Sequence, residues 1–420
     1  MTTSGTGERA LERILREEAP QVLGALVRRF GRFELSEEAV QEALVVAHRD
    51  WSRDGLPREP RSWLIRVAYR KLIDLLRSEE ASHRRERDAL VTDPRLDPTR
   101  APAPSPDHDD SLELLVLCCH PTLSAPSQIA LTLRAVGGLT TAEIAHAYGV
   151  SESTMATRIS RAKQTLRSND VRFELTDDDD LDARASVVAK VLYLIFNEGY
   201  AATAGQALTR VDLTAEAIRL TRLLAQVLPQ NAEIRGLLAL MLLSEARRPA
   251  RQDGDSLIPL ADQDRNVWDR DLIDEGSRIV QDAWHSGPIG PFLIQAAINA
   301  LHAQAPSAGD TDWPQIAALY LGLERVEPTN PVRLGRVVAV SRAFGARRGL
   351  ALLDDLDRTH TLSDDPLTAG RTHAVRGHLL DEVGEHDAAR TEFAAAQSLT
   401  TNEVERRYLA DRAEHAGWQA

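Results

Sequence analysis

The sequence predicts an all-α protein made of two small helical domains followed by a larger helical-repeat domain. Aromatic residues make up only 5% of the 420 residues, while alanine and leucine recur throughout, and this composition favours helix over strand. Apolar residues also return at intervals of three and four, as they do on the buried face of a helix. Two breaks in this pattern, at residues 80–110 and 171–182, divide the chain into three parts, which fits a chain of this length.

Residues 8–79 are predicted to form the first helical domain. Ser36 precedes Glu37 and Glu38, so it is expected to cap a helix with acidic residues in its first turn. A loop rich in glycine, proline and charge follows from Ser52 to Pro60, and the next helix is expected from about Arg61 to Arg77. The positions expected to be buried in these helices include Leu11, Leu15, Val22, Leu23, Leu26, Val40, Ala43, Ala47, Trp63, Ala68 and Leu72.

Residues 80–110 are predicted to be a flexible linker. The segment TDPRLDPTRAPAPSPDHDD within it contains five prolines, no aromatic residue and almost no apolar one. Such a segment cannot bury enough surface to offset the entropy lost on ordering.

Residues 111–170 are predicted to form a second small domain that contains a helix-turn-helix. Thr140 or Thr141 is expected to cap its first helix, Gly149 to end that helix, and Ser151 to cap the second one. The buried side of the second helix follows from spacings of four, three and four residues, which join Met155, Ile159, Ala162 and Leu166.

The opposite side of this second helix is the strongest candidate for contact with DNA. Residues 153–168 carry four basic side chains and no acidic one, although the whole chain has a net charge of −13. A helix that enters the major groove needs hydrogen-bonding tips and positive charge on one side, and arginine can read guanine edges. The alternative is an ordinary solvated helix face. The candidate residues are Ser153, Thr154, Thr157, Arg158, Arg161 and Lys163, of which Thr157 and Lys163 suit phosphate contacts.

A second basic helix, expected from Arg61 to Arg77, interleaves positive charge with Trp63 and Tyr69. Basic and aromatic residues together suit strand separation or single-strand binding, because bases stack on rings while the backbone charge is neutralised. The alternative interpretation places Trp63 in the core and leaves the charges solvated.

Residues 171–182 are predicted to be an acidic linker, with four aspartates from Asp177 to Asp180, and residues 183–420 a helical-repeat domain. Residues 181–420 hold 25 basic and 33 acidic side chains, so their net charge is −8. A small hairpin is expected between Arg251 and Leu260. One unit has the packing pattern of a tetratricopeptide repeat, with Gly377, Gly384, Ala389, Phe393, Ala396 and Leu399 at its small and large positions.

Several classes of function are disfavoured. No apolar run approaches the ~18 residues that a membrane span needs, and charged residues precede the first apolar run, so we expect a cytoplasmic protein without a signal peptide. Cys118, Cys119 and His120 have the wrong spacing for a metal site and are expected to be buried. No phosphate loop, zinc motif or nucleophile elbow is present, so we expect no cofactor and no enzymatic activity.

Two stretches of the chain resemble the extracytoplasmic-function sigma factors of bacterial RNA polymerase. SEEAVQEALVVAHRDW and PRSWLIRVAYRKLIDLLR look like their region 2, and LTTAEIAHAYGVSESTMATRISRAKQTLR looks like their region 4. VLYLIFNEGY, LADQDRNVWDR, QAAINALHAQAPSAGDTDW and ERRYLADR are similar to a subgroup with a fused tetratricopeptide-like domain. The resemblance covers nearly the whole chain.

The resemblance implies two partners, core RNA polymerase and promoter DNA, and no membrane partner. The helix carrying Glu38, Gln41 and Glu42 would dock on the β′ clamp helices, and region 4 would contact the β flap. The region-4 helix would read the −35 element. The residues that would capture and melt the −10 element are Arg61, Ser62, Trp63, Arg66, Arg70 and Lys71.

The resemblance also implies a regulatory role for the repeat domain. Asn197, Glu198 and Tyr200 are expected to be free to contact region 2, region 4 or the polymerase. We favour a domain that holds the sigma core in its active arrangement through an intramolecular contact, with autoinhibition as the alternative. Two rival functions stay open: a helix-turn-helix regulator with a repeat sensor, which leaves residues 8–79 unexplained, and a repeat scaffold or enzyme, which leaves both basic helices unexplained.

Overall fold

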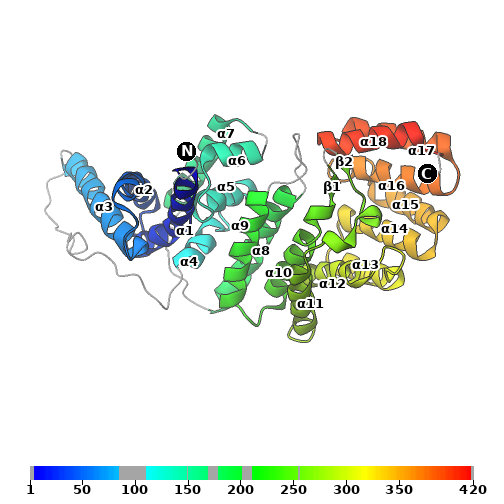
Figure 1. The fold of residues 1–420 in the computed structure, drawn as a ribbon, viewed down its shortest axis with the longest axis horizontal. Coiled ribbons are helices and arrows are strands. Elements are labelled where there is room, and N and C mark those ends of the chain that lie inside the picture. Colours follow the sequence, from blue (N-terminus) through cyan, green and yellow to red (C-terminus); the bar gives the residue numbers. More distant parts are fainter. Residues whose placement is uncertain are drawn as a thin grey trace. The chain divides into compact units, whose positions relative to one another are not determined.

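The computed structural model describes residues 4–84, 110–148, 150–168, 178–200, 211–253 and 256–417. The fold is all-α, as expected: the described residues form α-helices, a few short 3-10 turns and one two-stranded hairpin (Figure 1). The contacts within the chain divide it into unit 1, Met1–Val191, and unit 2, Leu192–Ala420. Helix α8, Asp178–Tyr200, crosses this division.

The first part of unit 1 consists of α1, Ser4–Phe30, α2, Phe33–Asp54, and α3, Pro60–Arg84. Gly31 and Gly55 adopt positive φ angles of 65° and 84°, which end α1 and α2. Helix α3 extends seven residues beyond its expected end at Arg77 and takes in the start of the predicted linker 80–110, whose residues 85–109 lie outside the described chain. The shared core of the three helices includes Val22, Leu26, Val40, Ala43, Ala68, Tyr69 and Leu72.

The second part of unit 1 contains the predicted helix-turn-helix. Thr140 and Glu143 form a capping box, because the Glu143 amide donates to Thr140 Oγ1 at 3.1 Å and the Thr140 amide donates to Glu143 Oε2 at 2.6 Å. Ser151 caps the next helix by accepting from the Thr154 amide at 3.2 Å. Gly149 lies outside the described residues. The helices are α4, Asp110–Cys118, α5, Ala125–Ala135, α6, Thr141–Ala147, and α7, Glu152–Ser168.

Helix α8 begins within the predicted acidic linker. The linker was expected to span residues 171–182, but residues 178–182 form the first turn of α8, and residues 171–177 lie outside the described chain. Acidic residues at a helix N-terminus interact favourably with the helix dipole, so a run of aspartates can open a helix as readily as it can form a linker.

Unit 2 continues as antiparallel helices that follow one another along a curved path (Figure 1). The hairpin expected between Arg251 and Leu260 is present, with β1, Gln252–Asp253, paired to β2, Ser256–Leu257. The helices are α9, Val211–Val227, α10, Ala232–Glu245, α11, Arg270–Ala283, α12, Pro291–Gln304, α13, Trp313–Val326, α14, Asn330–Phe344, α15, Ala346–His360, α16, Ala369–Glu382, α17, His386–Leu399, and α18, Glu403–His415.

The predicted tetratricopeptide unit is the pair α16 and α17. Phe393 is fully buried, and a Cβ added at Gly377 would lie 2.9 Å from its ring, so the glycine lets the two helices approach. Gly384 turns the chain between them with a φ of +87°. Leu399 differs from the expectation: it lies in the last turn of α17 and is 52% exposed.

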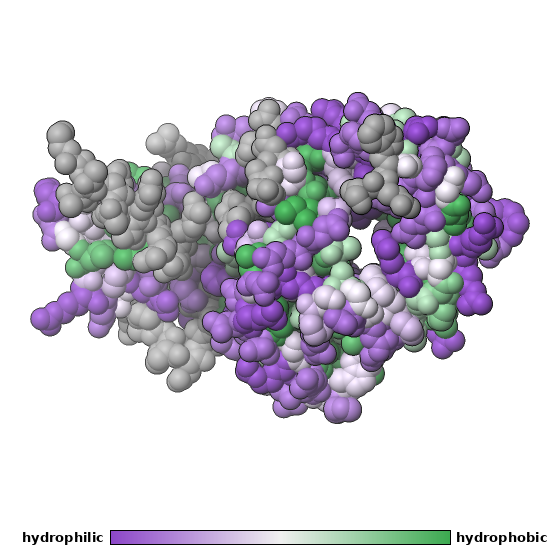
Figure 2. Space-filling model, turned by 45° about the vertical axis from the view of Figure 1, so that its right-hand side comes forward, coloured by the Kyte–Doolittle hydropathy of each residue, from purple (hydrophilic) through white to green (hydrophobic). Residues whose placement is uncertain are grey.

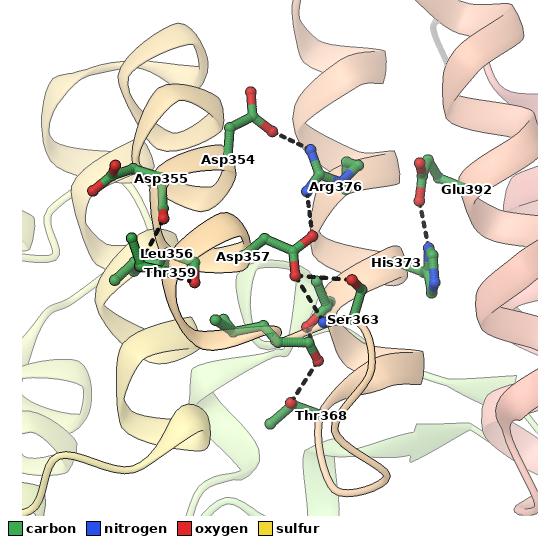
Figure 3. Close-up of polar contacts among 12 residues, drawn as sticks. Asp354, Asp355, Leu356, Asp357, Thr359, Ser363, Thr368, His373, Arg376 and Glu392 are labelled. Carbon is green, nitrogen blue, oxygen red and sulfur yellow. Dashed lines mark hydrogen bonds and ion pairs between the residues drawn. The ribbon is translucent and has the colours of Figure 1, made fainter.

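Polar bridges join neighbouring helix pairs in this part of unit 2 (Figure 3). Arg376 of α16 donates to Asp357 of α15 at 3.0 Å and also binds Asp354. Asp357 in turn accepts from the amide and the hydroxyl of Ser363, both at 2.8 Å. Burial raises the pKa of Asp357, but these hydrogen bonds and Arg376 outweigh it, so the net pKa is lowered.

Candidate promoter and polymerase interfaces

Helix α7 has the two faces that its sequence predicts. Met155, Ile159, Ala162 and Leu166 are all buried, which confirms the expected stripe. Thr154 and Thr157 on the other face are exposed, and Thr157 Oγ1 donates to the Ser153 carbonyl at 2.9 Å. The hydroxyl groups of α7 are therefore held in place by its own cap and backbone.

The exposed face of α7 borders an open cleft of about 440 Å³. Most of its lining was predicted from the sequence, but Ser127 was not. Ser127 lies in the first turn of α5 and comes next to α7 only through the tertiary packing. Its hydroxyl accepts from Ser124 at 3.1 Å. The lining residues are Ser127, Ser153, Thr154, Thr157, Arg158 and Arg161.

Arg158 and Arg161 keep their guanidinium groups available at this cleft, since neither has an ion-pair partner in the described chain. Lys163, which was expected to contact phosphate, is engaged differently. Its ammonium group binds the Glu37 carboxylate of α2, and its side chain is only 18% exposed. In this arrangement the structure brings two of the three predicted basic side chains to the cleft.

Glu37 is the centre of a buried junction between the two parts of unit 1. The residue is 7% exposed and binds Lys163 of α7 through Oε2 and Arg134 of α5 through Oε1, the latter at 3.3 Å. Nearby, Arg167 of α7 binds Glu34 of α2 at 2.5 Å. The sequence predicted Glu37 only as an acidic residue that follows a Ser36 cap. The predicted cap is wrong, because α2 begins at Phe33 and Ser36 lies buried inside it.

The basic residues of α3 fall into two groups. Arg61 and Lys71 pair with acidic residues of the same helical module, Arg61 with Glu18 at 2.6 Å and Lys71 with Glu42 at 2.9 Å. Arg66 and Arg70 are exposed, and neither has an ion-pair partner in the described chain. Because they are four residues apart, they lie on one face of α3.

Trp63, for which a core and a surface position were both considered, is half-buried. Its ring contacts that of Trp51 edge-on, with centroids 5.2 Å apart, and the rim of this aromatic pair reaches the surface. Ser62 donates to Glu59 at 3.0 Å. Tyr69, the other aromatic residue of α3, is fully buried.

The outer face of α2 carries the residues predicted to bind polymerase. Glu38 and Gln41 are exposed, while Glu42 is half-buried and paired with Lys71. The sequence reasoning missed Val45, which follows Gln41 by four residues on this face and is 71% exposed. Val45 adds an exposed apolar side chain to this otherwise polar face.

The comparisons with known proteins agree with these two modules. Residues 14–82 match the family model described as sigma-70 region 2, and residues 113–166 match sigma-70 region 4. A family of unknown function, DUF6596, matches residues 184–284. An uncharacterised protein of Rhizobium meliloti (strain 1021) is 40% identical over 408 residues, which cover 94% of this chain and 93% of the relative. No solved structure matches the chain.

The chain is a sigma factor of the sigma-70 family. It has the two regions of an extracytoplasmic-function factor and a C-terminal extension, and such a factor directs promoter recognition. Region 2 comprises α1–α3, and region 4 comprises α4–α7. This accounts for residues 8–79, which a helix-turn-helix regulator would leave unexplained. Among the described helices, none combines the length and the hydropathy that a membrane crossing requires.

The two cysteines of the sigma factor are packing residues, as their spacing suggested. Both are buried in region 4, and burial is the main cause that raises the pKa of each thiol, that of Cys119 to about 12. Within the described part of the chain, no group of three histidine, cysteine or acidic side chains is arranged to hold a metal ion.

The residues expected to be free for regulatory contacts are largely used inside unit 2. Glu198 is only 6% exposed, and the Tyr200 ring stacks on Phe196 at 5.6 Å between centroids. Asn197 is half-buried and hydrogen-bonds with Tyr193. Gly199 cannot bear a side chain, because its Cβ would lie 2.7 Å from the backbone of Thr214 in α9. This end of α8 is therefore tightly packed against its neighbours.

Proposed function

We propose that α7 reads the −35 element with Arg158 and Arg161, while Ser153, Thr154, Thr157 and Ser127 position the helix on the phosphate backbone. The open cleft with two unpaired guanidinium groups supports this assignment most directly. Arginine can bind guanine O6 and N7 with two parallel hydrogen bonds, whereas hydroxyl groups suit phosphate oxygens.

We assign capture of the −10 element to the exposed face of α3. Arg66 and Arg70 would neutralise the backbone of the separated strand, and the exposed rim of the Trp63–Trp51 pair would stack on a base. Arg61 and Lys71 would mainly hold the module together, because both are paired with acids.

The exposed stripe Glu38, Gln41 and Val45 on α2 is the proposed docking site for the β′ clamp helices, with the β flap as the partner of region 4. The polymerase would perform the chemistry, and the sigma factor would act beside it in the cytoplasm.

Run-off transcription with core polymerase tests this function. A template with both promoter elements should give transcript only when core enzyme and this protein are both present, and Arg158→Ala should reduce the yield when the −35 element is needed. Lys190→Ala, at an exposed cation of unit 1 outside both proposed interfaces, is the matched control. Specific binding to duplex DNA without any polymerase-dependent transcript would contradict the proposal.

For the C-terminal extension we favour a positive role, in which it holds regions 2 and 4 in their active arrangement. The net charge of −8 over residues 181–420 and the basic character of the two promoter-reading helices support an intramolecular contact, and the same attraction would support autoinhibition. Truncation after Asn169 separates the two. Loss of transcription with retained core binding indicates activation, whereas higher transcription indicates a brake, and an unchanged level contradicts both.

A further inference from the structure

Three segments of unit 2 that are far apart in the sequence are joined by hydrogen bonds. They are residues 192–200 at the end of α8, residues 260–269 before α11, and residues 295–313 along α12 and its following loop. The Tyr193 hydroxyl donates to Gln295 Oε1 at 3.3 Å. Arg265 reaches the end of α12 and donates to the backbone carbonyls of His302 and Ala305 at 2.5 and 2.7 Å.

Three arginines at this meeting point bind only uncharged oxygens. Arg247 donates to Asn299 Oδ1 at 3.2 Å, and Arg251 donates to the Tyr200 carbonyl. None of the three, Arg265 included, has a carboxylate within ion-pair distance in the described chain. The neighbouring acid Glu245 pairs with Arg248 at 2.5 Å. The charges of Glu245 and Glu405 act on Arg251, and that of Asp310 acts on Arg265, but none of these acids forms an ion pair with the three arginines.

Arg247 is the least satisfied member of this group. It lies half-buried after the end of α10, and its Nε is fully buried without any hydrogen-bond partner among the described residues. A buried donor that is left unpaired costs free energy comparable to a lost hydrogen bond. An external acceptor would satisfy this donor.

The positive charge of these arginines affects the pKa of neighbouring groups. Burial is the main cause that lowers the pKa of Arg265, and the charge of Arg247 lowers it further. Burial also lowers the pKa of His302 to about 4, with Arg247 and Arg265 adding to the effect. Cations gathered in a partly desolvated place repel one another, and an anion placed among them would relieve that repulsion.

Tyrosines lie near two of the arginines. The guanidinium of Arg251 lies over the Tyr200 ring, 3.8 Å from its centroid. The Tyr320 ring lies directly on Gly335, where a Cβ would be only 2.4 Å away, so the glycine makes room for this ring. Burial is the main cause that raises the pKa of Tyr320. Among its ionisable neighbours, Tyr193 raises this pKa further and Arg247 lowers it. Tyr320 therefore lies close to both residues.

The solenoid returns on itself, which limits the size of a partner at its inner side. The first half of unit 2 contacts its last helix, because β2 packs against α18. Figure 1 shows β2 beside α18, and in Figure 2 an opening is visible within unit 2, on the right of the view. Burial raises the pKa of Tyr193, and the charges of Glu327 and of Arg371 in α16 also act on it. A closed solenoid leaves little room for a long helix and favours a small ligand.

We propose that this arginine–tyrosine cluster, formed by Arg247, Arg251, Arg265, Tyr193, Tyr200 and Tyr320, binds a small multivalent anion through its phosphate or carboxylate groups. Guanidinium groups with free N–H donors form charge-assisted hydrogen bonds with such groups, and the tyrosines add ring faces and hydroxyl donors. The cluster would give the sigma factor a ligand site separate from its promoter and polymerase interfaces.

Isothermal titration of the full-length protein with sodium phosphate and with citrate tests the proposal. Sodium chloride at matched ionic strength gives the background. We expect saturable binding of at least one of the two anions to the wild type. Arg247→Gln should weaken it by at least about tenfold, since it removes charge-assisted hydrogen bonds. Arg325→Gln, at an exposed arginine of α13, is the matched control and should bind like the wild type.

The two anions distinguish the sources of the shared chemistry. Binding of phosphate alone indicates a phosphoryl ligand, and binding of citrate alone indicates a polycarboxylate. Circular dichroism checks that each variant is folded, and Arg251→Gln replaces Arg247→Gln if the latter is not. The proposal is overturned if neither anion binds above the chloride background, or if the folded Arg247→Gln or Arg251→Gln protein binds as tightly as the wild type.

Discussion

At the scale of single residues, the two unpaired arginines of α7 differ from the paired Lys163. Arg158 and Arg161 border the cleft without a carboxylate partner, so their charge and donors are available to bases. Lys163 instead forms an ion pair with Glu37. A substitution at either arginine should therefore affect DNA recognition with little effect on the fold.

We predict that Arg158→Ala and Arg161→Ala each weaken recognition of the −35 element by about 1–3 kcal/mol, the range for a base-reading arginine. Competition between promoters with intact and altered −35 elements, read by transcript yield, measures the loss of discrimination. Lys190→Ala should discriminate like the wild type. Unchanged discrimination by both arginine variants would contradict the assignment of Arg158 and Arg161 to the −35 element.

We predict that unit 2 loses stability as the pH falls below about 6.5. Burial, with nearby arginines adding to it, lowers the pKa of His302 and of His378 to about 4, whereas the unfolded chain titrates near ~6.5. Between these values the unfolded state binds more protons, so the free energy of unfolding falls by up to about 1.4 kcal/mol per pH unit for each histidine.

Urea unfolding at several pH values between 4.5 and 7.5 checks this. His302→Asn should flatten the pH dependence over that window, whereas the same change at exposed His285 should leave it as in the wild type. A wild-type stability that is constant or rises as the pH falls contradicts the prediction.

At the scale of elements, α2 has two functional faces. Its outer stripe of Glu38, Gln41 and Val45 is exposed, and its N-terminal end carries Glu34 and Glu37, which pair with residues of region 4. A change on the outer stripe can therefore alter polymerase binding while the region 2–region 4 junction stays intact.

We predict that Glu38→Lys and Val45→Asp each reduce affinity for core polymerase, the first through charge reversal and the second through an unpaired charge in an apolar contact. Their effect should be about tenfold or more in Kd, corresponding to roughly 1.4 kcal/mol. Asp74→Lys, at an exposed acid of α3, is the control. Fluorescence-detected titration with core enzyme measures the Kd of each variant. Undiminished affinity of both variants counts against the docking site.

At the scale of the whole sigma core, regions 2 and 4 are held together through Glu37, Lys163 and Arg134. Elements centred near −10 and −35 are about 25 base pairs apart, or about 85 Å along B-DNA. While these side chains hold region 2 against region 4, the two regions cannot bind both promoter elements at once. The residues 85–109 between α3 and α4 could span at most roughly 80–90 Å, so the covalent chain permits the separation.

We predict that Glu37→Gln shifts the free sigma factor toward a separated arrangement of regions 2 and 4. Removing this carboxylate leaves two cations without their shared partner in a poorly solvated junction, a change that commonly costs about 3–5 kcal/mol at buried pairs. Energy transfer between dyes attached at Arg49→Cys and Gln164→Cys should fall, because the two dyes move apart. Cys118 and Cys119 are buried and therefore protected from labelling. Glu38→Gln, the exposed neighbour, should keep the wild-type transfer, and equal transfer in both variants would contradict the prediction.

The sequence by itself determined the local structure of this protein and most of its family-level function. The stripe Met155, Ile159, Ala162 and Leu166 and the Ser151 cap depend on spacings of a few residues, so they could be predicted without a fold. The hairpin and the packing of Phe393 on Gly377 follow from equally local patterns. The exact ends of α3 and α8 could not be predicted, because charged segments with few prolines are compatible with both a helix and a linker.

Only the tertiary structure decided which side chains are free and which are paired. Glu37, Lys163 and Arg134 are separated by up to 126 positions, and nothing in their local sequence marks them as partners. The same holds for Ser127 at the cleft, and for Arg247, Arg251 and Arg265 around the tyrosines. The physical reason is that ion pairing and desolvation depend on distance and burial in space, whereas sequence patterns report only on neighbours along a helix.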